Sequence, residues 1–284
     1  MTKRIWGAVT AAALAVLLAG CLVLPGKFGS DLSLRRDGTF SYAYKGEIYL
    51  LALAEPDKPA ADDDAKFEPS PCYDEETIEE KACTADELAA QKAEWDEARK
   101  GAADKKKQDA EMMKAMMGGI DPSDPKAGEM FAERLARQAG WNSVIYKGKG
   151  VFEVDYAITA RLDHDFAFPT IEKMSSVAPF ATLVRRNDGT VRVEAPGFAS
   201  NGAGNPMLAF MQAMGSSMGG TGPAKSDNDK LPKAEGVFTV VTDGEVLAND
   251  TDEGPKADPM GKRLTWNVGA LTTAAPTALI KLGN

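Results

Sequence analysis

The stretch "VFEVDYAITARL", residues 151–162, decides the fold because its side chains alternate in character over its whole length. The apolar side chains fall on one face, and these are Phe152, Val154, Tyr156, Ile158, Ala160 and Leu162. The polar ones fall on the other face, and these are Glu153, Asp155, Thr159 and Arg161. A period of two predicts a β-strand, and a single apolar face is typical of an antiparallel sheet with one side buried.

Further strands of this kind are predicted on both sides of residues 151–162. Phe40, Tyr42 and Tyr44 alternate with smaller or polar residues after the turn signal Asp37-Gly38. Residues 182–195 are typical of a hairpin that turns at Asn187-Asp188-Gly189. The remaining strands are expected at 236–248, 262–268 and 276–282.

Two of the predicted turns resemble each other. They are "LRRDGTF", residues 34–40, and "LVRRNDGTV", residues 183–191. The similarity has two explanations, a duplicated β unit or two hairpins that use the same turn chemistry. We favour the second explanation.

The middle of the chain predicts helices. Thr84 and Glu87 have the spacing of a capping box, and the helix that they begin runs to Gly118-Gly119 with few large apolar residues, so most of its surface should face water. A shorter helix is expected at 125–139. We therefore predict an α+β fold in which an antiparallel β-sandwich-like domain, residues 21–71 and 141–284, carries a helical insertion, residues 72–140.

Cys72 and Cys83 are the only cysteines after Cys21. In an oxidising compartment they should form a disulfide, which would stabilise so short a loop by roughly 3 kcal/mol in the chain-entropy model. The alternative is a metal or redox pair. That alternative would require C-x-x-C spacing or a nearby His, and neither is present.

The N-terminus has the three parts of an export signal. Lys3 and Arg4 precede the apolar residues 5–17, and Ala19-Gly20 forms a small-residue cleavage site. The uncharged run extends to Gly26, which is long enough to cross a bilayer, so an uncleaved membrane helix is the alternative. Because the positive residues stay inside, both interpretations place residues 30–284 outside the cytoplasm.

The sequence Leu18-Ala19-Gly20-Cys21 resembles the lipobox of bacterial lipoproteins. The resemblance implies that residues 1–20 are removed as a signal peptide and that Cys21 carries acyl chains, such as palmitate, that insert into a lipid bilayer. Leu22 follows the cysteine where an aspartate would imply retention in the inner membrane, so the resemblance implies the outer membrane, facing the periplasm. Pro25-Gly26 leads almost directly into a predicted strand, which places the folded part close to the lipid.

Charge limits the choice of partners. Without residues 1–20 the chain keeps 31 Lys and Arg against 42 Asp and Glu. This acidic balance argues against binding to nucleic acid and against electrostatic docking on anionic lipid.

Residues 197–234 form a Gly-, Asn- and Ser-rich segment that contains a short methionine helix. Its four methionines share one helical face, and they are Met207, Met211, Met214 and Met218. Three interpretations stay open: an apolar stripe packed on the sheet, a docking surface for lipid or protein, and a Cu(I) site made of thioethers. We expect the segment to be mobile in the isolated protein and to dock through its methionine face.

No catalytic or cofactor motif is apparent. His164 is the single His, and if the strand continued, Asp163 and Asp165 would point to the opposite face from it. No G-x-S-x-G motif presents a serine nucleophile, and no phosphate-binding glycine loop or zinc spacing occurs. We therefore expect a protein that is not an enzyme and has no cofactor.

Cys21 leading into a β-hairpin, together with the closing "LTWNVGALTTAAPTALIKL", residues 264–282, resembles the LppM-type β-sandwich lipoproteins of bacterial envelopes. The resemblance covers the β segments and implies a fold rather than an activity. We predict a lipid-anchored interaction or structural module at the outer membrane whose partner is an envelope protein or lipid. A binder of lipid or another apolar ligand within the sandwich is the alternative, and a methionine-rich copper-binding module is the third.

Overall fold

A computed structural model describes residues 23–54, 66–73, 80–174, 177–199 and 232–283 of the chain. The chain divides into two compact units. The first, called the β unit below, comprises Met1–Ala54 and Pro122–Asn284, and the second, called the helical unit, comprises Glu55–Asp121.

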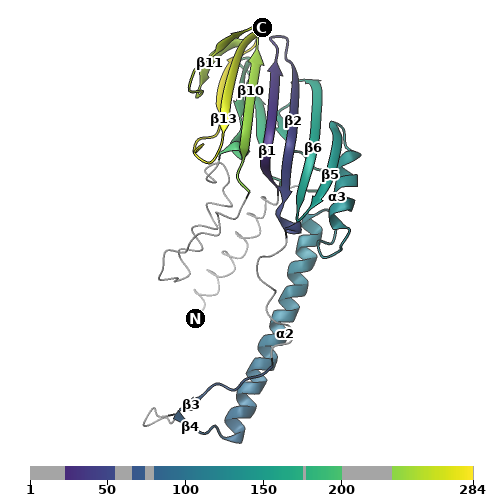
Figure 1. The fold of residues 1–284 in the computed structure, drawn as a ribbon, viewed down its shortest axis with the longest axis vertical. Coiled ribbons are helices and arrows are strands. Elements are labelled where there is room, and N and C mark those ends of the chain that lie inside the picture. The colour runs from purple at the N-terminus through teal and green to yellow at the C-terminus, as the bar shows by residue number, and fades with distance from the viewer. Residues whose placement is uncertain (1–22, 55–65, 74–79, 175–176, 200–231, 284) are drawn as a thin grey trace. The chain divides into compact units, whose positions relative to one another are not determined.

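The larger sheet of the β unit has seven strands in the order β12-β13-β10-β1-β2-β6-β5 (Figure 1). In chain order these strands are β1 Val23–Leu34, β2 Thr39–Leu50, β5 Trp141–Gly148, β6 Val151–Arg161, β10 Glu235–Thr242, β12 Lys256–Asp258 and β13 Gly261–Val268. Neighbours are antiparallel except β1 and β10, which are parallel. The predicted strand at 151–162 is therefore confirmed as β6, which pairs with β2 on one side and with β5 on the other.

The smaller sheet has five antiparallel strands in the order β11-β14-β9-β8-β7. In chain order these strands are β7 Phe166–Phe168, β8 Ala181–Arg185, β9 Thr190–Glu194, β11 Glu245–Asn249 and β14 Thr277–Lys281. Two short 3₁₀ helices, η1 Leu51–Leu53 and η2 Pro196–Phe198, follow β2 and β9. The hairpin predicted at 182–195 is β8 and β9.

The strand predicted at 236–248 is two strands, one in each sheet. The chain bends at Asp243-Gly244, so β10 belongs to the larger sheet and β11 to the smaller one. Gly244 is needed at this bend because a Cβ there would come within 2.8 Å of Ile280 and of the Lys281 carbonyl oxygen. The apolar alternation continues through the bend in the sequence, which is why it suggests one strand.

Aromatic side chains fill the space between the two sheets. Tyr44 of β2 lies 5.0 Å from Phe168 of β7 between ring centroids, and Phe28 of β1 lies 4.1 Å from Phe198 of η2. Burying such large rings provides most of the apolar area that stabilises two packed layers. The predicted α+β class with a β-sandwich-like domain is thus confirmed.

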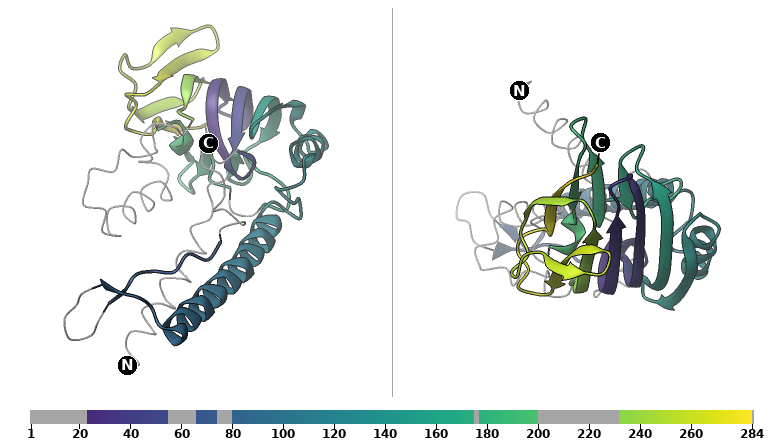
Figure 2. Two further views of the ribbon diagram at one scale, coloured as in Figure 1. Left: turned by 60° about the horizontal axis from the view of Figure 1, so that its bottom comes forward. Right: turned by 90° about the horizontal axis from the view of Figure 1, so that it is seen from above.

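Helix α3, Ala127–Ala136, belongs to the β unit. The buried Phe131 packs edge-on against Phe152 of β6, with ring centroids 5.2 Å apart. Gly128 lets the helix approach β5 closely, because a Cβ there would overlap the Tyr146 ring. Figure 2 shows α3 beside the β5 side of the sheet. The boundaries between the units therefore lie at 54/55 and 121/122 and not at 71/72 and 140/141. Helix α3 joins the β unit because its apolar face is buried against β5 and β6.

Helix α2, Ala85–Met116, is the longest element of the helical unit (Figure 1). Its capping box is complete, because Thr84 accepts a hydrogen bond from the Glu87 amide while Glu87 accepts one from the Thr84 amide. None of its 32 residues is buried. The expected water-facing helix that begins at Thr84 is confirmed.

Candidate functional site

The β unit has two ends along its strands, which we name by the direction of β1. The proximal end is where β1 begins, and there Val23 pairs with Leu50 of β2. The distal end is where β1 finishes, and there Leu34 pairs with Phe40 of β2 and Thr242 of β10. The two ends differ in the side chains that their connecting loops carry.

Val23 is a buried residue of the sheet and follows Cys21 by only two positions. Cys21 itself lies outside the described residues. Two residues of extended chain span at most about 7 Å, so an acyl group on Cys21 would begin close to the proximal end. The structure is therefore compatible with the predicted short link between lipid and fold.

The methionine-rich segment is connected to the same end of the β unit. Its four candidate residues, Met207, Met211, Met214 and Met218, lie outside the described residues. Its described flanks are Ala199, which follows η2, and Pro232, which precedes β10. Because β10 runs parallel to β1, its first residue also lies toward the proximal end.

The loop at 269–276, between β13 and β14, also leaves from the proximal end. Val268 pairs with Gly236, and Gly236 pairs with Phe28 near the start of β1. Two hydrogen bonds close the turn, one from the Gly269 amide to Thr272 Oγ1 (2.9 Å) and one from the Thr272 amide to the Gly269 carbonyl (2.9 Å). Leu271 lies within this turn and is 93% exposed.

The turns at the distal end are rich in aspartate. Asp37 Oδ1 accepts hydrogen bonds from the amide and the hydroxyl of Thr39, and Asp188 Oδ1 does the same with Thr190. In each pair the threonine hydroxyl is the main reason why the pKa of the aspartate is lowered. The two similar turn sequences thus form the same turn, as two hairpins with shared chemistry would.

A second group of charged residues joins the distal turns to each other. The Arg36 amide donates to Asp243 Oδ1 (2.8 Å), and Arg35 Nη1 donates to the Met260 carbonyl (3.0 Å). Within the β12–β13 hairpin, Arg263 donates twice to Asp258 Oδ2, at 2.9 and 2.7 Å. These hydrogen bonds stabilise turns that carry many charged residues. The distal end is therefore highly polar.

His164 lies in a polar surface pocket at the distal end. The pocket has a volume of about 600 Å³, and its lining includes Asp163, Asp165, Arg185 and Arg186. The alternation that would point both aspartates away from His164 does not apply, because β6 ends at Arg161 and residues 162–165 form no strand. The Asp165 carboxylate accepts a hydrogen bond from the Arg185 amide (3.1 Å), so it positions the loop.

Cys72 and Cys83 form the predicted disulfide, with a Cα–Cα distance of 5.2 Å. The short ladder of β3 Cys72–Tyr73 and β4 Glu80–Lys81 lies beside it. Gln91 of α2 joins the same site, since its amide group exchanges hydrogen bonds with the backbone of Ser70 at 2.9 and 3.2 Å. The disulfide therefore fastens a loop to the first turns of α2.

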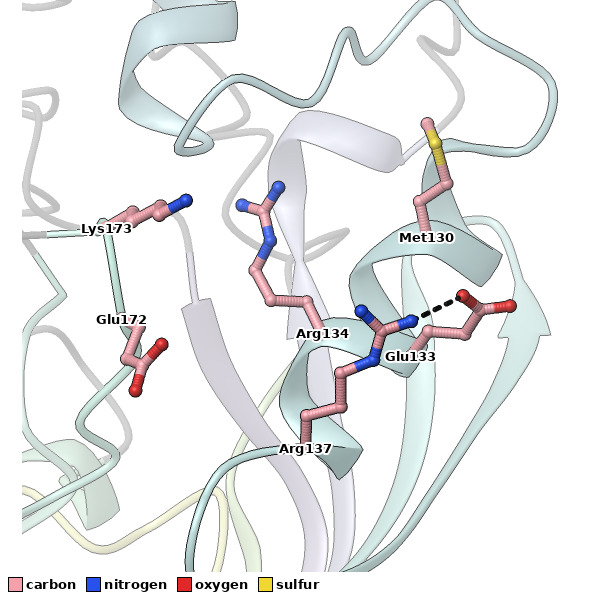
Figure 3. A pocket seen from close by; sticks show the side chains of 6 residues that line it. All are labelled: Met130, Glu133, Arg134, Arg137, Glu172 and Lys173. Atoms are coloured by element: carbon pink, nitrogen blue, oxygen red, sulfur yellow. Dashed lines mark hydrogen bonds and ion pairs between the residues drawn. The ribbon is translucent and has the colours of Figure 1, made fainter.

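A second pocket, of about 430 Å³, lies between α3 and the loop at Glu172–Lys173 (Figure 3). Arg134 and Lys173 point toward one another across it, while Glu172 lies below Lys173 and Met130 forms part of the rim. Arg137 pairs with Glu133 at 3.5 Å along the helix. Three cationic side chains, Arg134, Arg137 and Lys173, would suit an anionic ligand, but Glu133 and Glu172 share the lining, so only one positive charge remains in excess.

The described ranges contain neither a cluster of metal-ligating side chains nor a helix that could cross a membrane. There, no three His, Cys, Asp or Glu side chains lie close enough together to hold a metal ion. Neither α2 nor α3 combines the length and the apolar character that crossing a bilayer requires.

Comparisons with known proteins give a weak structural likeness. No protein-family model matches the chain, and no curated protein matches it significantly in sequence. Among solved structures it is similar to the folded domain of LppM from Mycobacterium tuberculosis, determined by NMR. The two are 12% identical, the alignment covers 93% of this chain and 92% of that domain, and the TM-score is 0.31.

Sequence reasoning missed Leu271 and the pocket of Figure 3. Leu271 belongs to a quoted stretch that reads as strand and turn, and nothing in the order of residues indicates that this leucine stays exposed. The pocket combines α3 with a loop more than thirty positions later in the chain. Only the packing of α3 on the sheet brings these residues together.

Proposed function

We propose that this chain is a bacterial envelope lipoprotein, anchored through acyl chains on Cys21, whose folded part acts as an interaction or structural module rather than as an enzyme. One observation carries the proposal. The sheet begins at Val23, two residues after the predicted lipidated cysteine, so the fold itself would stand at the membrane surface. Several acyl chains hold a protein on a bilayer durably, whereas one chain does so only marginally.

The helical unit supports an interaction role. Residues 98–111 of α2 are all exposed, and most of them are alanines or charged residues of both signs. A helix this long, with none of its residues buried, is stabilised locally by its cap and its disulfide rather than by a core of its own. Such a surface can bind a partner in the envelope without any change in the fold.

The alternative, an apolar ligand held inside the sandwich, has less support. The centre of the interface is filled by rings such as Phe168, whose centroid lies 4.6 Å from that of Tyr156 and 5.0 Å from that of Tyr44. A ligand between the sheets would have to displace rings packed at this density.

Acylation and fractionation test the proposal. The full chain, expressed in a bacterial host supplied with labelled palmitate, should take up label and float with the outer membrane on a density gradient. Cys21→Ala should abolish the label and release the chain from that fraction. The matched control, Cys72→Ala with Cys83→Ala, removes two other cysteines and should keep both label and fractionation.

An uncleaved helix gives a different result. Wild-type chain without label, together with a Cys21→Ala variant that stays in the membrane, would replace the lipoprotein with a membrane-spanning N-terminus. The partner is tested separately by a photocrosslinking residue at Lys105 of α2, which should capture an envelope component that the same residue at Thr159 of β6 does not.

A further inference from the structure

The loop at 269–276 combines three features that together indicate contact with lipid. Leu271 is 93% exposed, which is the largest value among the exposed large apolar side chains of the described residues. Its turn is closed by the two Gly269–Thr272 hydrogen bonds, so the leucine is held outward. Residues 264–280 contain no charged side chain, so little is lost when the loop leaves water.

A single exposed leucine is ordinary on a protein surface, so its location decides the argument. The loop leaves from the proximal end, where β13 finishes at the level of Phe28 and β1 begins at Val23. The distal turns, in contrast, carry Asp37, Asp188 and Asp243. Hydrated aspartates oppose transfer into a bilayer interface, and an uncharged turn with a leucine favours it.

We propose that Leu271 inserts into the interface of the bilayer that carries the Cys21 acyl chains, and so fixes how the β unit faces the membrane. This inference rests on the proposed lipid anchor. The acyl chains supply the attachment, and the leucine supplies a second point of contact. The proximal end then faces lipid, and the distal turns with the His164 pocket face the periplasm.

Fluorescence depth measurements on the full acylated chain test this inference. With Cys21 acylated and Cys72 bonded to Cys83, Leu271→Cys introduces one free thiol, which can carry an environment-sensitive dye. In phosphatidylethanolamine–phosphatidylglycerol vesicles, the dye at 271 should emit at a shorter wavelength than it does in water. Lipids with a quencher on the acyl chain should reduce its emission at least twofold. Met260→Cys at the distal end is the matched control, because Met260 is also an exposed apolar residue, and its dye should be unaffected.

Each other result overturns the inference. If the protein floats with the vesicles but the dye at 271 is no more quenched than the dye at 260, the leucine does not insert and the anchor stands. If the dye at 271 is shielded from aqueous quencher but not reached by lipid quencher, a protein surface covers the loop instead. If the chain is not acylated and does not float, the anchor and the inference fall together.

Discussion

The β unit and helix α2 belong to one chain but are stabilised in opposite ways. The β unit buries aromatic rings between two sheets, whereas α2 buries none of its residues and depends on a capping box, a disulfide and local pairs such as Lys92–Asp96. Burial of side chains between the sheets fixes the shape of the β unit, whereas local stabilisation leaves the surface of α2 free for other contacts. This difference explains how one protein can combine a tightly packed β unit, whose proximal end we propose to lie at a membrane, with a long exposed helix.

Removing a ring from the core should give the largest effect. Phe168 is fully buried and lies 4.6–5.8 Å from the rings of five neighbours. Phe168→Ala should lower the free energy of unfolding by about 3–5 kcal/mol, measured by urea denaturation. Trp95→Ala in α2 is the control, since Trp95 is only half-buried against Phe67 and Arg99, and it should cost about 1 kcal/mol. An equal loss of the free energy of unfolding in the two variants would contradict the difference between the β unit and α2.

Removing the disulfide should give the next largest effect, confined to the helical unit. Cys72→Ser with Cys83→Ser should destabilise the loop that they close by about 3 kcal/mol in the chain-entropy model. Amide exchange should accelerate around residues 80–91 while the β6 amides keep their protection. If β6 loses protection to the same extent, the two units are coupled in folding.

Loss of the helix cap should be smaller. Thr84→Ala removes the hydroxyl that accepts from the Glu87 amide, which typically costs about 1 kcal/mol of helix stability. Hydrogen exchange should show fraying of the first turn of α2. Thr159→Ala on the exposed face of β6 is the control and should change nothing comparable; a response there of the same size would show that the measurement is not specific to the cap.

Acid should weaken the same cap by a small amount. Hydrogen bonds from the Thr84 amide and from Lys81 lower the pKa of Glu87, so its folded-state pKa lies below the unfolded value of about 4.3. The contribution of the ionised side chain is present above that unfolded value and is lost as the pH falls through the folded pKa. Protection of the first-turn amides, relative to their intrinsic exchange rate at each pH, should therefore fall below about pH 4, and Glu87→Gln should remove this dependence. A pH response that persists in the glutamine variant would assign it to another group.

Much of this architecture could be predicted because the signals are local. The alternation at 151–162 identifies β6, and the Thr84–Glu87 spacing identifies the start of α2. The bend at Asp243-Gly244 was missed because apolar alternation continues through it, and only the smaller sheet shows that the chain changes layer. Likewise, the buried face of α3 shows that it is amphipathic, but whether it packs on the sheet or on α2 depends on contacts with Phe152 that no local pattern contains.

The candidate site was predicted less completely, for a physical reason. The disulfide can be predicted from the sequence alone, because the prediction needs only two cysteines and an oxidising compartment. The conformation of the loop at His164 cannot be predicted in this way, because the directions of Asp163 and Asp165 depend on β6 ending at Arg161. Exposure of Leu271 is a property of the finished fold. It gains meaning only from the register through β10, which places the end of β13 at the level of the start of β1.

The intact mass of the protein, purified from membranes of its own host without reduction, tests the lipid anchor most directly. We predict a chain that begins at Cys21, carries a diacylglyceryl group on sulfur and an acyl group on nitrogen, and has no free thiol at Cys72 or Cys83. A chain that still contains residues 1–20 and bears no acyl group would contradict it.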